Sequence, residues 1–231
     1  MPIFFQHPIN ETTRLGIWKI EESEEFFLSN VPLQKEVTHP HKRLQHLAGR
    51  FLLQFLFPDF PYDLIRIADT LKPYLADEQY HFSISHCGDF AAAIVSNNRR
   101  VGVDIEIPSE KAERIKHKFL NEDEQKMVNS LPIAIGRSMD NGQRSELRTK
   151  SADESLLYAQ QNSKLTTLFW SGKESVFKWY GEGGVDFRQH IQLKKMHEGT
   201  ETIDCFFKKT SQSLIIHYRL FDHLVLAWVV S

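Results

Sequence analysis

Residues 82–107 read FSISHCGDFAAAIVSNNRRVGVDIEI, and this stretch decides the fold class. Polar and apolar residues alternate over 80–85, an almost continuous apolar run follows over 90–95, and alternation returns over 101–107. Residues 97–100, between the last two segments, have the composition of a turn. Because alternation is the period of a strand and short turns join antiparallel neighbours, the stretch predicts a meander of two or three antiparallel strands.

Helical patterns stand on both sides of this meander. Over 40–57, apolar side chains recur at spacings of three and four, which gives a helix one buried stripe. A second helix is predicted over 167–180, and Gly181 is well placed to end it. Asn121 and Glu124 have the spacing of a capping box, which predicts a helix start there. Shorter elements are expected as helices over 21–28, 109–119 and 121–130, and as strands over 15–20, 191–196, 202–207, 214–220 and 224–230.

Each half of the chain therefore has helices followed by an antiparallel meander. The segments 89–95 and 222–230 also share a similar pattern of an acid followed by an apolar run. These features favour a duplicated α+β architecture. Residues 132–163 are polar and show no clear period, and we interpret them as a mobile loop with a little helix near 153–161.

Composition limits the class of protein. The 231 residues include 28 Lys and Arg against 30 Asp and Glu, a formal net charge of −2, which argues against binding nucleic acid or anionic lipid through bulk charge. The longest apolar runs, around 51–57 and 224–230, are far shorter than the about 20 residues that span a bilayer. The first residues lack the pattern of a signal peptide, and Cys87 and Cys205 form no CxxC pair. We expect a cytoplasmic protein without a membrane segment.

Two pairs of charged residues are candidates for chemistry. Asp104 and Glu106 are two apart on a predicted strand, so both carboxylates point to one face, and an exposed strand edge with solvated acids is the alternative interpretation. Glu174 and Lys178 are four apart on a predicted helix, where a surface ion pair is the alternative. Trp170 shares their stripe, and such aromatic surroundings are unusual for surface charges. Three carboxylates and a lysine suggest a hard divalent cation, most naturally Mg²⁺, with phosphate as a further ligand.

Two segments resemble the signature motifs of the phosphopantetheinyl transferases. They are VGVDIE at 101–106 and FWSGKESVFK at 169–178, and the family motifs take the forms [IV]-G-[IV]-D-x-E and [FW]-[ST]-x-K-E-[AS]-x-x-K. FSISHCGDF at 82–90 is similar to the family's strand and Ser-His segment, and Lys72-Pro73 resembles its upstream Lys-Pro. The order of these motifs and the chain length are similar to those of the single-chain Sfp-type branch, not of the short trimeric branch.

This resemblance implies a fold of two similar α+β subdomains related by a pseudo-twofold, each with helices packed on an antiparallel sheet. Residues 1–103 would form the N-terminal subdomain, with the helix and strands that bind coenzyme A. Residues 104–231 would carry the metal-binding and catalytic motifs, and the active site would lie between the two. A chain that contains both halves would work as a monomer.

The resemblance also implies a reaction. The family transfers the 4'-phosphopantetheine arm of coenzyme A to a serine hydroxyl of a carrier protein and releases adenosine 3',5'-bisphosphate. Asp104, Glu106 and Glu174 would hold Mg²⁺, or Mn²⁺, with the pyrophosphate. Glu174 would be the base for the serine proton, and Lys178 would stabilise the leaving bisphosphate. The residues implied to bind coenzyme A are Arg50, Lys72, Ser85, His86, Lys173 and Lys178.

Some positions are less clearly matched to the family. Lys42 and Arg43 are weaker candidates for phosphate binding, because a solvated helix face explains them equally well. Leu71 stands where a glycine usually precedes Lys-Pro, which puts the local turn and the role of Lys72 in question. The polar 132–163 segment precedes the catalytic helix, where the carrier protein is expected to dock.

Two other functions are considered. One is a homologue that binds coenzyme A or a carrier protein without catalysis; the intact acids and lysine argue against it, whereas the long 132–163 segment leaves it open. The other is a Mg²⁺-dependent nuclease, which would also use an acid pair, a later glutamate and a lysine. Such a nuclease has its glutamate and lysine two apart on a strand, whereas Glu174 and Lys178 are four apart on a predicted helix. The expected partners are coenzyme A and an acyl or peptidyl carrier protein, and neither nucleic acid nor a membrane.

Overall fold

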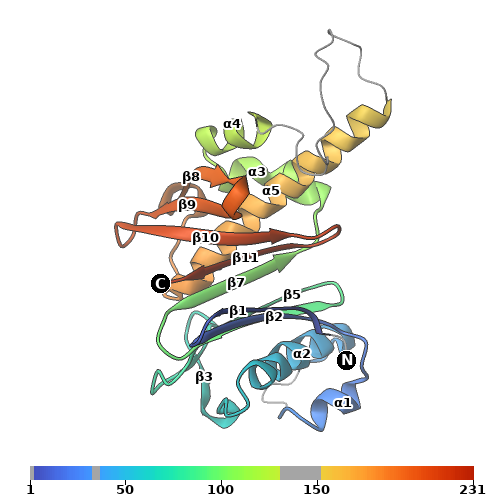
Figure 1. The fold of residues 1–231 in the computed structure, drawn as a ribbon, viewed down its shortest axis with the longest axis vertical. Helices are drawn as coiled ribbons and strands as arrows, with labels where there is room; N and C mark the ends of the chain where they lie inside the picture. Colours follow the sequence, from blue (N-terminus) through green and yellow to red (C-terminus); the bar gives the residue numbers. More distant parts are fainter. Residues whose placement is uncertain (1–2, 33–36, 131–151) are drawn as a thin grey trace.

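The computed structural model describes residues 3–32, 37–130 and 152–231, with backbone only for 152–158. It has an α+β fold in which antiparallel sheets are covered by helices, which confirms the predicted fold class. Figure 1 shows two halves stacked along the long axis of the molecule.

The first half is a four-stranded antiparallel sheet with one long helix. The strands β1 (Ile3–Asn10), β2 (Thr13–Lys19), β6 (Phe90–Ser96) and β5 (His81–Cys87) lie in that order. Helix α2 (Pro40–Leu56) packs on this sheet, and the short helix α1 (Glu24–Leu28) packs on α2. Because Ala48, Leu52 and Leu56 recur every four residues along α2, they lie on one face of the helix and are fully buried against the sheet.

A small hairpin follows α2. The 3₁₀ helix η1 (Tyr62–Leu64) leads into β3 (Ile65–Ile67), which pairs with β4 (Pro73–Leu75). The sequence did not predict this pair, because strands of this length carry too few residues for a period to show.

The second half is a five-stranded antiparallel sheet with several helices. Its strand order is β7 (Val101–Glu106), β11 (Val225–Val230), β10 (Gln212–Leu220), β9 (Thr202–Phe207) and β8 (Ile191–His197). Helix α5 (Ala152–Tyr180) packs on β7 and β11. The remaining helices are α3 (Glu110–Phe119), α4 (Glu122–Ser130), α6 (Phe187–His190) and the 3₁₀ turn η2 (Glu198–Thr200).

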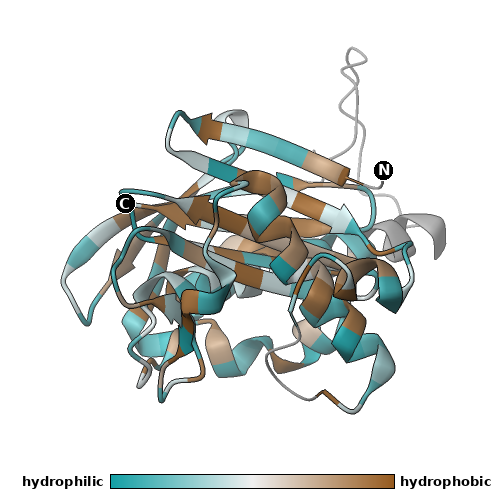
Figure 2. Ribbon diagram, turned by 90° about the horizontal axis from the view of Figure 1, so that it is seen from below, coloured by the Kyte–Doolittle hydropathy of each residue, from teal (hydrophilic) through white to brown (hydrophobic). Residues whose placement is uncertain are grey.

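The two sheets meet face to face. Leu15 and Ile94 of the first sheet pack with Val103, Ile105 and Leu226 of the second in one buried cluster. Figure 2 shows the apolar strands gathered in the interior of the molecule. The sheets also meet edge to edge, since the Val103 amide donates a 3.1 Å hydrogen bond to Ser83 Oγ on β5. Residues from both halves can therefore contribute to one site along β5 and β7.

Several sequence predictions need correction. Strand β1 was missed, because Pro8 and polar residues interrupt its apolar pattern and the strand lies at a sheet edge, where proline is tolerated. Helix α5 begins at Ala152, not near 167, because the sequence of its first turns contains good helix formers but shows no clear apolar period. Of the predicted mobile loop 132–163, residues 132–151 lie outside the described residues and 152–163 are helical. Strand β7, which spans the expected boundary at residue 103, belongs wholly to the second sheet.

The capping box at Asn121 is confirmed, since Asn121 Oδ1 accepts from the Glu124 amide at 3.0 Å and Glu124 Oε2 accepts from the Asn121 amide at 2.8 Å. None of the helices in the described part of the chain combines the length and the apolar composition needed to cross a bilayer.

Candidate active site

Asp104 is the centre of the site. Its Oδ1 accepts hydrogen bonds from Lys178 Nζ at 2.7 Å and from Ser85 Oγ at 2.8 Å. Lys178 Nζ also donates to Ser85 Oγ at 2.8 Å, so the three side chains form a closed triangle. Asp104 is 3% exposed, which excludes the interpretation of a solvated acid on an open strand edge. The triangle joins β5 of the first half to β7 and α5 of the second.

Alternation along β7 explains which side chains reach α5. Val103 and Ile105 point into the core between the sheets, and Asp104 and Glu106 point to the opposite face, toward α5. The prediction that both carboxylates share one face is therefore correct. On α5, the four-residue spacing brings Glu174 and Lys178 to the side that faces β7.

Gly102 allows α5 to approach β7 closely. A Cβ atom at Gly102 would lie 2.0 Å from the Ser175 carbonyl oxygen and 2.6 Å from the Trp179 amide nitrogen. These are backbone atoms of α5, so no side-chain rotation could relieve the contact. The glycine of the VGVDIE segment is therefore needed to place Lys178 beside Asp104.

We expect Gly102→Ala to destabilise the protein by about 3 kcal/mol, at the upper end of the effects of overpacking. Thermal or urea denaturation measures the change. Gly199→Ala is the matched control, since nothing lies within 4 Å of a Cβ at that position. Equal stability of the two variants would show that α5 can move away from β7 without lowering the free energy of unfolding.

Glu106 and Glu174 are half-buried carboxylates beside Asp104. Burial, and secondarily the charge of Asp104, raise the pKa of both groups to about 7. Trp170 Nε1 donates to Glu106 Oε1 at 3.3 Å and opposes the shift at Glu106, while the charge of Lys178 opposes it at Glu174. The site therefore concentrates negative charge that its own lysine only partly compensates.

A pocket of about 410 Å³ adjoins this cluster. Arg50 and His46 of α2 and His86 of β5 lie at its polar side, and Ile67 and Leu71 belong to its apolar wall. Desolvation by the pocket walls, and secondarily the Lys178 charge, lower the pKa of the His86 ring. Burial lowers the pKa of Arg50. The pocket thus combines the Arg50 guanidinium and the ring nitrogens of two histidines with an apolar wall, which suits a ligand that is anionic at one end and has an apolar ring.

Ser85 and His86 separate in the structure. Adjacent strand residues point to opposite faces, so Ser85 contacts Asp104 and Lys178 whereas His86 lines the Arg50 pocket. The resemblance implied that both bind coenzyme A, and it did not indicate that Ser85 is a partner of Asp104.

The comparison with known proteins follows this geometry. A family model described as the 4'-phosphopantetheinyl transferase superfamily matches residues 100–229, which include the Asp104, Glu106, Glu174 and Lys178 positions. The chain belongs to the 4'-phosphopantetheinyl transferase superfamily. The resemblance inferred from the two motifs is confirmed at this level. A search of curated proteins finds no match for this transferase.

The donor set of the transferase suits a hard divalent cation. Asp104 Oδ2 is buried without a hydrogen-bond partner among the described residues, and two further carboxylates of raised pKa lie near it. A cation would neutralise this charge and use the unpaired oxygen. In the described part of the chain, no three acidic, histidine or cysteine side chains already converge as a metal-binding group, so Glu106 and Glu174 would have to draw in toward Asp104.

These pKa shifts predict a pH dependence for the metal-free transferase. The folded state raises the pKa of Glu106 and Glu174 from an ordinary 4.5 to about 7. The contribution of each carboxyl to the free energy of unfolding is therefore fully present below pH 4.5 and is lost as the pH rises through about 7. We expect the double variant Glu106→Gln/Glu174→Gln to gain stability over wild type between about pH 5.5 and about pH 8. Thermal melts in EDTA over this pH range measure the difference in stability between the two proteins. A difference that stays constant with pH would contradict the raised pKa values.

Lys173 does not lie near the site, contrary to the sequence prediction that it contacts the phosphates of coenzyme A. Its side chain is fully buried on the other side of α5, where Nζ donates to Glu124 Oε2 at 2.8 Å. It also donates to three backbone carbonyls, those of Phe119, Phe187 and Ile191. Lys173 therefore joins α5 to the rest of the second half and has a structural role.

Lys72, just before β4, lies beside the C-terminal end of α5. It lines a second cavity, of about 230 Å³, together with Lys178 and Gly181, but it is absent from the walls of the Arg50 pocket. Burial, and secondarily Arg100, lower the pKa of Lys72 to about 8. The structure therefore groups Lys72 with Lys178 and not with His86.

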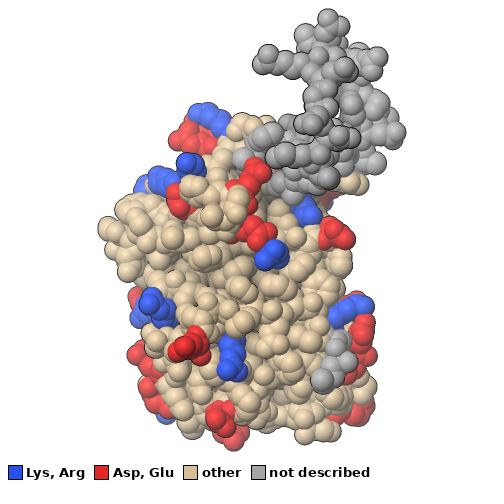
Figure 3. Space-filling view, in the orientation of Figure 1, with Lys and Arg blue, Asp and Glu red and all other residues tan. Residues whose placement is uncertain are grey.

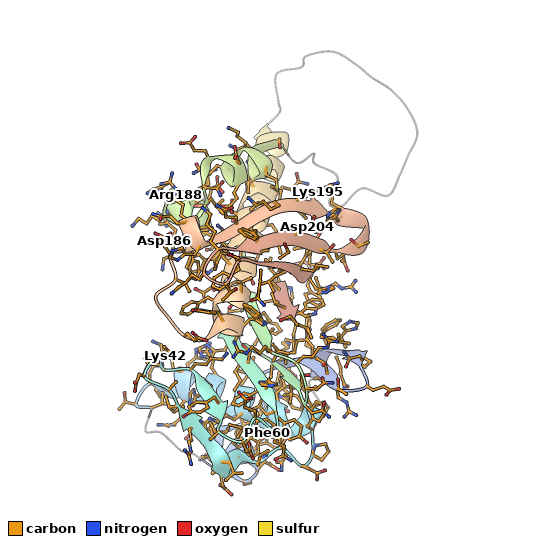
Figure 4. All side chains as sticks on the ribbon, turned by 90° about the vertical axis from the view of Figure 1, so that its left-hand side faces the viewer. Lys42, Phe60, Asp186, Arg188, Lys195 and Asp204 are labelled. Atoms are coloured by element: carbon orange, nitrogen blue, oxygen red, sulfur yellow. The ribbon has the colours of Figure 1, made fainter. Side chains whose placement is uncertain are left out.

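The two weaker candidates differ from each other. Arg43 donates to Glu24 Oε2 at 2.8 Å and to the Val37 carbonyl at 3.1 Å, so it ties α2 to α1 and is not directed at the site. Lys42 contributes to lowering the pKa of His86, and Figure 4 labels it at the level where the two halves meet. Lys42 therefore stays a candidate for the pocket.

Proposed function

We propose that this transferase moves the 4'-phosphopantetheine arm of coenzyme A to a serine hydroxyl of an acyl or peptidyl carrier protein and releases adenosine 3',5'-bisphosphate. The observation that carries the proposal is the Asp104–Ser85–Lys178 triangle, with two carboxylates of raised pKa, beside a pocket that contains Arg50 and His86. The superfamily match to residues 100–229 supports phosphopantetheinyl transfer as the reaction.

Coenzyme A fits the character of the Arg50 pocket. Its adenine is a flat ring for the apolar wall of Ile67 and Leu71, and its 3'-phosphate is an anion for Arg50 and His86. The adjacent cavity with Lys72 and Lys178 leads toward Asp104 and is suited to the pyrophosphate. We therefore propose that coenzyme A lies along the boundary between the two halves.

Asp104, Glu106 and Glu174 would hold a Mg²⁺ or Mn²⁺ ion. The bound ion would supply positive charge to the pyrophosphate oxygens and so favour displacement at phosphorus. The residues of the chain supply the remaining chemistry.

In the proposed step, the carrier serine oxygen forms a bond to the phosphorus that carries the pantetheine arm. The bond from that phosphorus to the bridging oxygen breaks, and adenosine 3',5'-bisphosphate leaves with the electron pair. Glu174 accepts the serine proton, for which a carboxylate with a raised pKa is suited. Lys178 donates a hydrogen bond to the leaving oxygen, after exchanging its contact with Asp104 for the substrate.

Incubation of an apo carrier protein with this transferase, coenzyme A and Mg²⁺ is expected to add the mass of one phosphopantetheine to the carrier, and EDTA should abolish the gain. Intact-mass spectrometry measures both. Several fatty-acid, polyketide and peptide-synthetase carriers are needed, because the site does not identify the carrier. Coenzyme A binding without any mass gain would instead indicate a non-catalytic homologue.

We propose further that the enzyme belongs to the single-chain Sfp-type branch and acts as a cytoplasmic monomer. Ser85 of the first half and Asp104 of the second meet within one chain, which supports a complete site without a partner subunit. Light scattering during size exclusion tests the monomer. Nucleic-acid binding has no support in the surface charge seen in Figure 3, where both signs are interspersed on the face in view.

A further inference from the structure

The turn between β3 and β4, residues 68–72, is here called the latch turn. The Ala68 amide donates to the Lys72 carbonyl at 2.9 Å, and the Leu71 amide donates to the Ala68 carbonyl at 2.8 Å. Leu71 adopts the left-handed conformation at φ 65, which is unfavourable for leucine, and its side chain is 76% exposed. The turn thus keeps its own hydrogen bonds and directs the residues on both sides of Leu71 toward the second half of the molecule.

These two residues contact the C-terminal end of α5. Thr70 Oγ1 donates to the Gly181 carbonyl at 3.0 Å, and Lys72 Nζ donates to the Trp179 carbonyl at 3.4 Å. The last carbonyls of a helix lack partners within the helix, and a cation is favourable at that end of the helix dipole. The latch turn therefore caps the catalytic helix from the opposite half of the molecule.

The backbone of Gly181 fits this contact closely. Gly181 has φ +77, and a Cβ there would lie 2.6 Å from Lys72 Cδ and 2.7 Å from its Nζ. The Thr70 methyl also lies 3.1 Å from the place of a Cβ on Gly183. The glycines that follow α5, which the sequence indicated only as a helix end, thus make room for the latch turn.

The latch turn also belongs to the walls of the two cavities assigned to coenzyme A. Leu71 and Pro73 line both cavities, and Phe177, Lys178 and Gly181 of the helix end face them across the smaller one. Lys178 is three residues before Gly181, less than one helical turn. A shift of the helix end would therefore move Lys178 relative to both Asp104 and the bound ligand.

We propose that Thr70 is a positioning residue: its bond to the Gly181 carbonyl holds the end of α5 so that Lys178 stays aligned with the coenzyme A cavities. This inference rests on the proposed function for its kinetic consequence, but not for the contact itself.

The test compares Thr70→Val, which removes the hydroxyl and keeps the shape, with Thr70→Ser, which keeps the hydroxyl. Thr200→Val is the matched control, because the exposed Thr200 hydroxyl bonds to Thr202, at the opposite end of β9 from the Phe207 that contacts Tyr180. Hydrogen exchange is measured on amides 177–181, and kcat and the KM for coenzyme A are measured with a carrier protein.

For Thr70→Val we expect exchange in the last turn of α5 to be about three- to tenfold faster, with the middle of α5 unchanged. We expect kcat to fall about tenfold and the KM to change less, since misplacement of Lys178 affects the transition state. Thr70→Ser should restore both values, and Thr200→Val should match wild type.

Unchanged exchange at 177–181 in Thr70→Val would overturn the latch, whatever the activity. Faster exchange with wild-type kcat would overturn its positioning role. If the wild-type protein modifies no carrier while the exchange difference persists, the proposed function fails and the latch contact stands. The two failures are therefore distinguishable.

Discussion

Glu174→Gln is expected to lower the rate of carrier modification by about 10²–10⁴-fold, the usual contribution of a general base. Glutamine keeps the volume and one oxygen of the side chain but cannot accept the serine proton. The substitution would also lower the affinity of the site for a cation. The assay is therefore run over a range of Mg²⁺ concentrations to separate metal affinity from turnover. Affinity for coenzyme A should change little, because Arg50 and His86 line a separate pocket.

Glu198→Gln serves as the control for Glu174→Gln, because Glu198 lies on η2, far from the triangle, and is exposed. It should retain the wild-type rate. A wild-type rate for Glu174→Gln at saturating Mg²⁺ would remove Glu174 as the base and leave another group to accept the proton. Retained coenzyme A affinity with no turnover in wild type itself would identify a binding protein instead of an enzyme.

Lys173→Met is expected to destabilise the protein by about 3–5 kcal/mol, because it leaves the fully buried Glu124 carboxylate without its cation. Three backbone carbonyls lose their donor at the same time. The free energy of unfolding, measured by urea denaturation, should fall by this amount. Coenzyme A affinity of the folded fraction should be unaffected.

A surface pair provides the control for this prediction. Lys126 bonds to Asp123 at 3.2 Å with both side chains largely exposed, so Lys126→Met should change stability by less than about 1 kcal/mol. In the double variant Lys173→Met/Glu124→Gln, part of the loss should be recovered, since the buried charge is removed. Wild-type stability with reduced coenzyme A affinity in Lys173→Met would restore the phosphate-binding role predicted from the sequence.

Features that depend on local periodicity could be predicted from the amino-acid sequence alone. Alternation along residues 101–107 placed Asp104 and Glu106 on one face, and four-residue spacing placed Glu174 and Lys178 on one side of a helix. The capping box at Asn121 and Glu124 was also predicted, because both partners are three residues apart. The two motifs identified the superfamily, which the family match confirms.

The partners that each face of a helix or strand contacts became clear from the three-dimensional fold. Lys173 and Glu174 are neighbours in the motif, yet they diverge by about 100° around the helix, so one joins Glu124 and the other faces β7. Ser85 and His86 diverge in the same way on a strand, toward Asp104 and toward the Arg50 pocket. A local pattern shows that two neighbouring side chains point in different directions. The residues that they contact belong to elements far away in the chain. The contact between Thr70 and Gly181, 111 residues apart, has no trace in local sequence for the same reason.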